Sequence, residues 1–245
     1  LAQNGHQVWL WGWQPQFQAA LRADRENKQY LPGIPFPEGV AVVDDLGALG
    51  EAQFVLLAVP TVGVRSTARS LRGGMRPDAV LITVAKGLEP GTLLRMSQVV
   101  QEENPGYFDV ALSGPSHAEE VSRAMPTAVV AACQRRENSE RVQDLFAGSN
   151  VRVYINDDQA GVELGGALKN VIAFAAGIAD GIGLGDNPKA ALMTRGITEI
   201  ARLGVALGAK VETFAGLSGV GDLIVTCTSM HSRNRRAGIL LGQGR

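Results

Sequence analysis

The hydrophobic pattern of this 245-residue chain changes once, at Asp158. Before that residue, short apolar runs of the kind that form buried parallel strands alternate with segments of helical period. Phe54–Val59 (FVLLAV) and Ala79–Val84 (AVLITV) are the clearest of these runs. Strands that alternate with helices indicate an α/β fold with a doubly wound, mostly parallel sheet. From Asp158 onward only the helical period remains, so we expect an α/β domain over residues 1–156 and an all-helical domain over residues 157–245.

The remaining patterns place the other elements. Strands are expected at Val8–Gly12, Ala41–Val43, Val110–Leu112, Thr127–Ala132 and Val151–Ile155, and helices at Val62–Leu71, Thr92–Glu103 and Asn138–Phe146. Ser116 and Glu119 have the spacing of a capping box, which predicts a helix that begins at Ser116. In the second half, Pro188 fits the first turn of a helix that Gly208 closes.

The composition excludes several classes of function. With 45% hydrophobic and 19% charged residues, the chain is an ordinary globular protein with room for a sizeable core. Its net charge of −1 provides no positive field, so we expect neither a nucleic-acid nor a membrane partner. Lys169 and Asp180 interrupt the longest apolar run, so no membrane span is expected. Cys133 and Cys227 lack metal-ligand spacing, which indicates free thiols in a cytoplasmic protein without a metal.

The two ends of the chain resemble the interior of a larger protein. Leu1–Gly5 has the pattern of the last turn of a helix, and Leu240–Arg245 stops without an evident domain boundary. The chain contains no GxGxxG fingerprint, and if Val8–Gly12 is the second strand of a dinucleotide-binding fold, the glycine loop would precede residue 1. We therefore expect truncation at both ends, and residues 1–245 alone are expected to be inactive.

The end of the expected strand Val8–Gly12 bears on whether NAD or NADP is bound. Trp11–Gln14 has no carboxylate at the position that usually binds the adenosine ribose 2′-hydroxyl. Tolerance of a 2′-phosphate follows as a weak inference, with Arg22 or Arg25 as its partners.

A single lysine lies in the apolar stretch Gly161–Asn170 (GVELGGALKN). Lys169 has leucine neighbours at helical spacing, and Gly165 and Gly166 permit a close approach one turn earlier. Desolvation disfavours the charged form of a lysine, so burial would lower its pKa and suit it to general acid–base catalysis. The alternative is a lysine whose stem packs while its head reaches water.

Polar groups follow two of the predicted strands. Lys86 comes after one strand, and Ser113–Ser116 (SGPS) comes after the next. Ligands of open parallel sheets collect at the carboxyl ends of the strands. The sequence therefore predicts a crevice that holds anionic groups, although Lys86 could equally be an exposed loop lysine.

Two further stretches lie near the end of the chain. Gly216–Asp222 is a glycine-rich turn whose Asp222 could orient an ammonium or a substrate hydroxyl, or simply cap a helix. Ser232–Arg236 (SRNRR) precedes an apolar run, so it lies at a helix start. Cations oppose the helix dipole there unless a phosphate is bound. The alternatives are a solvated basic patch or a nucleic-acid contact.

Six motifs together resemble one family. They are AVP (Ala58–Pro60), AKGLE (Ala85–Glu89), SGPS (Ser113–Ser116), LGGALKN (Leu164–Asn170), GLSGVGDLIVTC (Gly216–Cys227) and SRNRR (Ser232–Arg236). In this order, and over essentially the whole chain, they are similar to bacterial NAD(P)-dependent sn-glycerol-3-phosphate dehydrogenases. The resemblance implies a Rossmann-type domain, here without its first strand and glycine loop, followed by an all-helical substrate domain. It also implies an enzyme that interconverts dihydroxyacetone phosphate and sn-glycerol 3-phosphate with NAD(P)H and supplies phospholipid synthesis.

The resemblance also implies roles for individual residues. Lys169 becomes the proton donor and acceptor at the C2 oxygen of a small phosphorylated substrate. The implied substrate-binding residues are Lys86, Gly114, Ser116, Lys169, Asp222, Ser232, Arg233 and Asn234, and those implied to border the cofactor are Trp13, Lys86, Ala118 and Arg233. Trp13 departs from the small or polar residue often expected at its position. The resemblance leaves homodimer formation open.

Two other functions remain open at this point. One is a dehydrogenase of the same build that acts on a hydroxyacid or a hydroxyacyl thioester; the latter would be expected to use a histidine. The histidines are His6, His117 and His231, and none lies near Lys169 in the sequence. The other is a non-catalytic nucleotide-sensing module, which dispersal of the polar residues would support.

Overall fold

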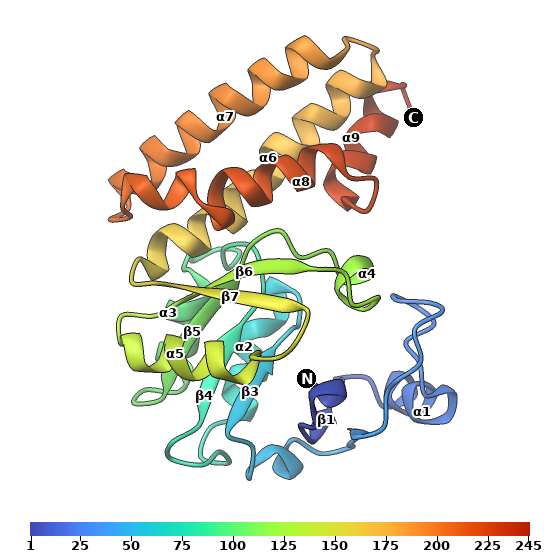
Figure 1. Cartoon of the computed structure of the whole chain (residues 1–245), viewed down its shortest axis with the longest axis vertical. Helices are drawn as coiled ribbons and strands as arrows, with labels where there is room; N and C mark the ends of the chain where they lie inside the picture. The colour runs from blue at the N-terminus through green and yellow to red at the C-terminus, as the bar shows by residue number, and fades with distance from the viewer.

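A computed structural model describes residues 1–245 and has two halves (Figure 1). One half is built on a five-stranded sheet, and the other is a group of helices at one end of that sheet. In spatial order the strands are β3 (Phe54–Leu57), β4 (Val80–Thr83), β5 (Phe108–Ser113), β6 (Thr127–Ala132) and β7 (Val151–Asn156). All neighbours pair in parallel except β5 and β6, which are antiparallel. The predicted mostly parallel sheet is confirmed.

The strand β4 shows why the apolar runs are continuous. Leu81 packs on one face of the sheet in a cluster with α2 (Thr61–Ser70) and α3 (Met96–Glu103). Ile82 packs on the opposite face in a cluster with α5 (Arg136–Leu145). Because helices cover both faces, all four residues of the strand are buried, and all but Thr83 are apolar.

A separate pair of parallel strands lies beside the sheet (Figure 1). It consists of β1 (Val8–Leu10) and β2 (Val40–Val42), with α1 (Pro15–Asp24) between them in the chain. Neither strand is hydrogen-bonded to the five-stranded sheet. A short 3₁₀ turn, Ala2–Asn4, precedes β1 and ends at Gly5, whose φ of 86° is left-handed as expected for a glycine that closes a helix.

The helical half begins where the sequence pattern changes. Its main helices are α6 (Gln159–Gly181), α7 (Asp186–Ala206), α8 (Asp222–Thr228) and α9 (Arg233–Gly242). The carboxylate of Asp158 caps α6 by accepting a hydrogen bond from Gly161 N at 2.9 Å. Its other oxygen accepts one from Thr213 Oγ1 at 2.6 Å, so the start of α6 is tied to the chain after α7.

The helix α6 is the element that the two halves share. It starts against the sheet and continues into the helical half, where it packs along α9 (Figure 1). Glycines allow this packing, because a Cβ on Gly238 would meet Gly177 Cα at 3.0 Å. By length and composition alone α6 could cross a membrane, but Lys169 and Asp180 interrupt its apolar sequence and half of its apolar window is buried inside the protein. Its apolar character reflects its place in the core.

Two expected helix starts were wrong. The helix α3 begins at Met96 and not at Thr92, because Leu93 has a left-handed φ of 59° that ends any helical run there. The helix α4 (Ala118–Val121) has no side-chain cap, so the capping box does not form. The hydroxyl of Ser116 donates instead to the carbonyl of Gly114 at 3.1 Å.

Candidate active site

The lysine on the apolar helix is buried and paired. Lys169 is only 5% exposed, and its ammonium donates hydrogen bonds to Asp222 Oδ1 and, at 2.7 Å, to Thr226 Oγ1. Asp222 is 1% exposed, and its carbonyl accepts a 2.5 Å hydrogen bond from the hydroxyl of Thr226. A buried ammonium needs such partners, since leaving it unpaired would be costly.

A second lysine shares the same carboxylate. Lys86, just beyond β4, donates to Asp222 Oδ2 at 2.9 Å and to the carbonyl of Gly114 at 2.6 Å. Its side chain is 22% exposed, so the alternative of a fully exposed loop lysine is excluded. Two cations around one anion leave a positive excess at the carboxyl ends of the strands. Burial of the ammonium, followed by the charge of Lys86, lowers the pKa of Lys169 to about 8 against the opposing effect of Asp222.

Glycines let α6 approach the strand ends and the turn before α8 closely enough for Lys169 to reach Asp222. A Cβ on Gly166 would meet Ser113 Oγ at 2.8 Å and Lys86 Cγ at 3.5 Å, so this position faces the strand ends. A Cβ on Gly165 would collide with the backbone of Ser218. Ser218 belongs to a π-helical turn that leads directly into α8, and this turn delivers Asp222 to the two lysines.

Two asparagines extend the cluster to α9. Asn170 donates to the carbonyl of Lys86 at 3.4 Å and accepts a 2.9 Å hydrogen bond from the side chain of Asn234. Asn170 was not predicted as a site residue. Its position next to Lys169 in the motif was the available signal.

Two arginines at the start of α9, Arg233 and Arg235, differ in whether their side chains are paired. The hydroxyl of Ser232 caps the helix by accepting a hydrogen bond from Arg235 N at 3.2 Å. Arg235 is held by Asp180 at 2.7 Å, so its guanidinium is part of the helix packing. Arg233, the first residue of α9, is exposed and makes no side-chain hydrogen bond or ion pair. It remains free to bind an anion.

The loop after β5 lies against the start of α9. The rings of His117 and His231 are 5.7 Å apart, and His231 Nδ1 lies 3.6 Å from Glu119 Oε1. These contacts bring Ser116 and its neighbours close to the residues that open α9. Gly114 has a φ of 139°, which favours glycine at this turn. Burial lowers the pKa of His117, which disfavours a charged imidazolium.

Three of the residues expected to border NAD(P)H are exposed to solvent. Trp13 is 71% exposed before α1, Ala118 is exposed at the first position of α4, and Arg233 is unpaired. The helices α1, α4 and α9 lie along the same side of the molecule in Figure 1. By contrast, Arg22 pairs with Asp44 at 2.6 Å and Arg25 donates to the carbonyl of Val40 at 2.6 Å. A 2′-phosphate would have to compete with these partners.

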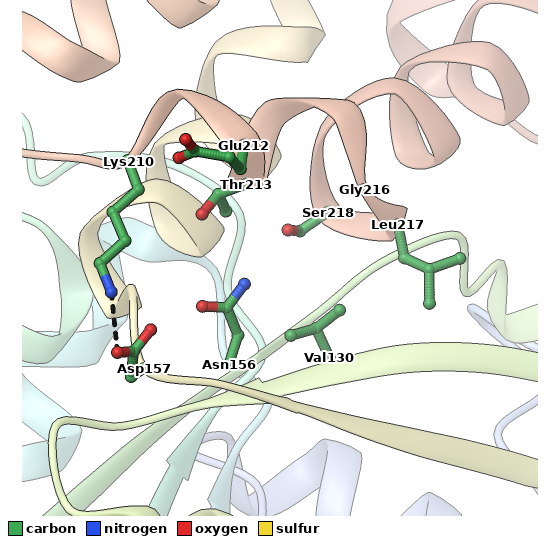
Figure 2. A pocket seen from close by; sticks show the side chains of 9 residues that line it. All are labelled: Val130, Asn156, Asp157, Lys210, Glu212, Thr213, Gly216, Leu217 and Ser218. Carbon is green, nitrogen blue, oxygen red and sulfur yellow. Dashed lines mark hydrogen bonds and ion pairs between the residues drawn. The ribbon is translucent and has the colours of Figure 1, made fainter.

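A polar cavity of about 370 Å³ lies apart from this cluster (Figure 2). It is bounded by the end of β7 and the turns before α8, and its residues are Val130, Asn156, Asp157, Lys210, Glu212, Thr213, Gly216, Leu217 and Ser218. Lys210 and Asp157 pair across its side at 2.7 Å. None of these residues was expected in the site, and the lining includes none of Lys86, Lys169 and Asp222.

The fold and the site together define a class of protein. A doubly wound α/β half, a helical half, and a buried lysine held between them at the strand ends are the build of a two-domain nicotinamide-dependent dehydrogenase. Residues 1–139 match the family model described as NAD-dependent glycerol-3-phosphate dehydrogenase N-terminus, and residues 158–245 match its C-terminus. The chain belongs to the NAD-dependent glycerol-3-phosphate dehydrogenase family.

Individual relatives agree with this assignment. The chain is 53% identical to a glycerol-3-phosphate dehydrogenase [NAD(P)+] of Clostridium perfringens, over all of this chain and 74% of the relative. It is 58% identical to the enzyme of that name in Moorella thermoacetica, over all of this chain and 73% of the relative. The crystal structure of glycerol-3-phosphate dehydrogenase from Coxiella burnetii superposes with a TM-score of 0.95 at 40% identity, over all of this chain and 75% of that one.

Proposed function

We propose that this protein interconverts dihydroxyacetone phosphate and sn-glycerol 3-phosphate with NAD(P)H. The observation that carries the proposal is the pairing of buried Lys169 with Asp222, at the strand ends that Lys86 also reaches. Membership of the family supports the reaction class. In the same proposal, residues 1–156 hold the dinucleotide and residues 157–245 hold the substrate.

Lys169 is the general acid and base of this proposal. NAD(P)H, which Trp13, Lys86, Ala118 and Arg233 would border, would supply the hydride for C2 of the substrate. As the C2 carbonyl becomes an alcohol, the ammonium of Lys169 gives a proton to its oxygen, and in the reverse direction the neutral amine accepts that proton. A pKa of about 8 keeps both forms of Lys169 within reach near neutral pH. Asp222 and Thr226 orient the ammonium, and Lys86 adds positive charge that stabilises the developing alkoxide.

The phosphate of the substrate is assigned to the start of α9. This ten-residue helix presents free backbone N–H groups at its first turn, and the unpaired guanidinium of Arg233 stands there. A bound phosphate offsets the unfavourable interaction of a cation with the positive end of the helix. The other side chains assigned to the substrate are those of Lys86, Ser116, Asp222, Ser232 and Asn234, with Gly114 contributing backbone.

Several expectations accompany this function. Trp13, Lys86, Ala118 and Arg233 are proposed to border NAD(P)H. The protein is proposed to act in the cytoplasm, where its product supplies phospholipid synthesis. Homodimer formation remains an expectation, which light scattering of the purified protein tests.

The direct test is an assay of the full-length protein with dihydroxyacetone phosphate and each of NADH and NADPH, followed by the loss of absorbance of the reduced nicotinamide. Saturable, phosphate-dependent oxidation of either cofactor is expected. Equal rates with a ketoacid or with a ketoacyl thioester, the oxidised forms of the alternative substrates, would overturn the substrate assignment.

A further inference from the structure

The proposed chemistry leaves one buried carboxylate on α6 without a role. Glu163 is 9% exposed and lies six residues before Lys169 on the same helix. Its Oε1 accepts a hydrogen bond from Ser97 N at 2.7 Å. Its Oε2 accepts one from Ser97 Oγ at 2.6 Å and one from Arg95 Nη1 at 2.5 Å. Burial raises the pKa of Glu163, and these hydrogen-bond donors oppose that rise. Keeping the buried carboxylate charged therefore costs free energy.

The partners of this carboxylate belong to a fixed part of the α/β half. Ser97 lies in the first turn of α3, so its N–H is one of the backbone donors that the helix itself leaves unpaired. Met96, Val99 and Val100 on the same helix are fully buried in the core against the sheet. The side chain of Glu163 therefore caps a helix of one half from a helix of the other.

The rest of the interface supplies few bonds that could set the position of α6 along its own axis. At its first residue, Gln159 donates to Asp109 Oδ2 at 2.6 Å, and just after Lys169 the side chain of Asn170 donates to the carbonyl of Lys86 at the longer distance of 3.4 Å. Between Glu163 and Lys169, Gly165 and Gly166 make close contacts but have no side chains that could lock against a neighbour. Six residues of α-helix span about 9 Å, so a shift of Glu163 is transmitted through a rigid helix to Lys169.

We propose that Glu163 is a positioning residue: its hydrogen bonds to the start of α3 fix the axial position of α6 and thereby place Lys169 at the substrate carbonyl. This inference rests on the proposed function, since it acts through Lys169. In this role Glu163 contacts neither the substrate nor the cofactor.

Shortening the side chain tests the proposal. Glu163→Asp keeps the carboxylate but removes one C–C bond, about 1.5 Å of reach. Either the hydrogen bonds lengthen or α6 moves. Since a misplacement of about 1 Å can cost on the order of 100-fold, kcat is expected to fall about 10- to 100-fold, with the KM for dihydroxyacetone phosphate within about threefold of the wild type.

Glu103 offers a matched control. It is a buried carboxylate at the end of α3, held by Arg65, Arg69 and Arg72 at 2.8 to 2.9 Å, and makes no hydrogen bond to α6. Glu103→Asp is expected to lower the stability of the full-length protein while leaving kcat within about twofold. An equal fall of kcat in both variants would show that any loss of packing around α3 suffices, and would overturn the proposal.

A double-mutant cycle separates this inference from the proposed function. In the Lys169→Met background, Glu163→Asp is expected to change the residual kcat by less than twofold, because the group that it positions is gone. An undiminished fall in that background would overturn the positioning role. If Lys169→Met alone keeps the wild-type kcat, the assignment of Lys169 as the general acid fails, and the positioning role fails with it. A wild-type protein that does not reduce dihydroxyacetone phosphate would instead show that the proposed function fails.

A milder variant covers the case in which Glu163→Asp does not fold. Ser97→Ala removes only the hydroxyl donor and leaves the backbone donor of the same residue in place. Its kcat is expected to fall about two- to fivefold with KM unchanged. An unchanged kcat would contradict the proposal, as would a KM that rises by the factor by which kcat falls.

Discussion

Replacing Asp222 with asparagine tests how the two lysines are held. The substitution keeps the shape of the side chain but removes the only negative charge that contacts Lys169 and Lys86. The ammonium of Lys169 would then face a second cation without a counter-ion. Because Asp222 raises the pKa of Lys169 towards its ordinary value, its removal is expected to lower that pKa below about 8.

The part of the stability loss that comes from the uncompensated charge has an upper bound set by that pKa. At pH 7, deprotonating a lysine with a pKa of about 8 costs roughly 1.4 kcal/mol, since each pKa unit corresponds to 1.36 kcal/mol. Deprotonation of Lys169 would remove the uncompensated positive charge from the variant. With one weakened hydrogen bond at each lysine, roughly 1 kcal/mol apiece, the free energy of unfolding of Asp222→Asn is expected to fall by about 3 kcal/mol.

Two measurements check this prediction. Urea unfolding at pH 7 gives the stability difference. The pH dependence of kcat/KM for dihydroxyacetone phosphate reduction gives the apparent pKa of the acid. A midpoint that moves at least one pH unit lower in Asp222→Asn is expected. An unchanged midpoint together with an unchanged unfolding free energy would refute the account of how the lysine is held.

Two further substitutions probe the anion site and the helix approach. Arg233→Ala is expected to raise the KM for dihydroxyacetone phosphate about 10- to 100-fold, the range of a charge-assisted hydrogen bond of 1.5–3 kcal/mol. The already poor reduction of unphosphorylated dihydroxyacetone is expected to change little. Arg236→Ala, which replaces an exposed arginine of the same helix, is the control in the same steady-state kinetics. Gly166→Ala places a methyl group 2.8 Å from Ser113 Oγ, so kcat is expected to fall at least tenfold in the same assay. A wild-type kcat would mean that α6 does not pack tightly against Ser113.

Much of the fold could be predicted from local patterns. The run at β4 is apolar because helices bury both faces of the sheet there, whereas Leu56 of β3 is 43% exposed although its run was expected to be buried on both faces. The change of period at Asp158 marks a helix cap. The antiparallel pairing of β5 with β6 was not predicted, because a short apolar run carries no information on direction. The capping box failed because α4 begins at Ala118, so His117 and not Ser116 is at the N-cap position.

The candidate site was predictable only in its separate parts. Lys169 was recognisable from its apolar surroundings, and Asp222 from a glycine-rich turn. The pairing of Lys86 with Asp222 joins positions 136 residues apart, which no local pattern reveals. Asn170 was missed for the same reason, since its partners lie on the β4 loop and on α9. The free state of Arg233 and the bound state of Arg235 are likewise decided by tertiary packing.

The central claim is that Lys169 transfers the proton at C2, and the pH dependence of kcat/KM in both directions tests it most directly. For dihydroxyacetone phosphate reduction, the protonated lysine is required, so kcat/KM is expected to fall about tenfold per pH unit above its pKa of about 8. For glycerol 3-phosphate oxidation, the neutral lysine is required, so kcat/KM is expected to rise to about that pH and then level. In Lys169→Met, kcat is expected to fall about 10²- to 10⁴-fold and these limbs to disappear. A variant that keeps more than half of the wild-type kcat, with both limbs intact, would contradict the assignment.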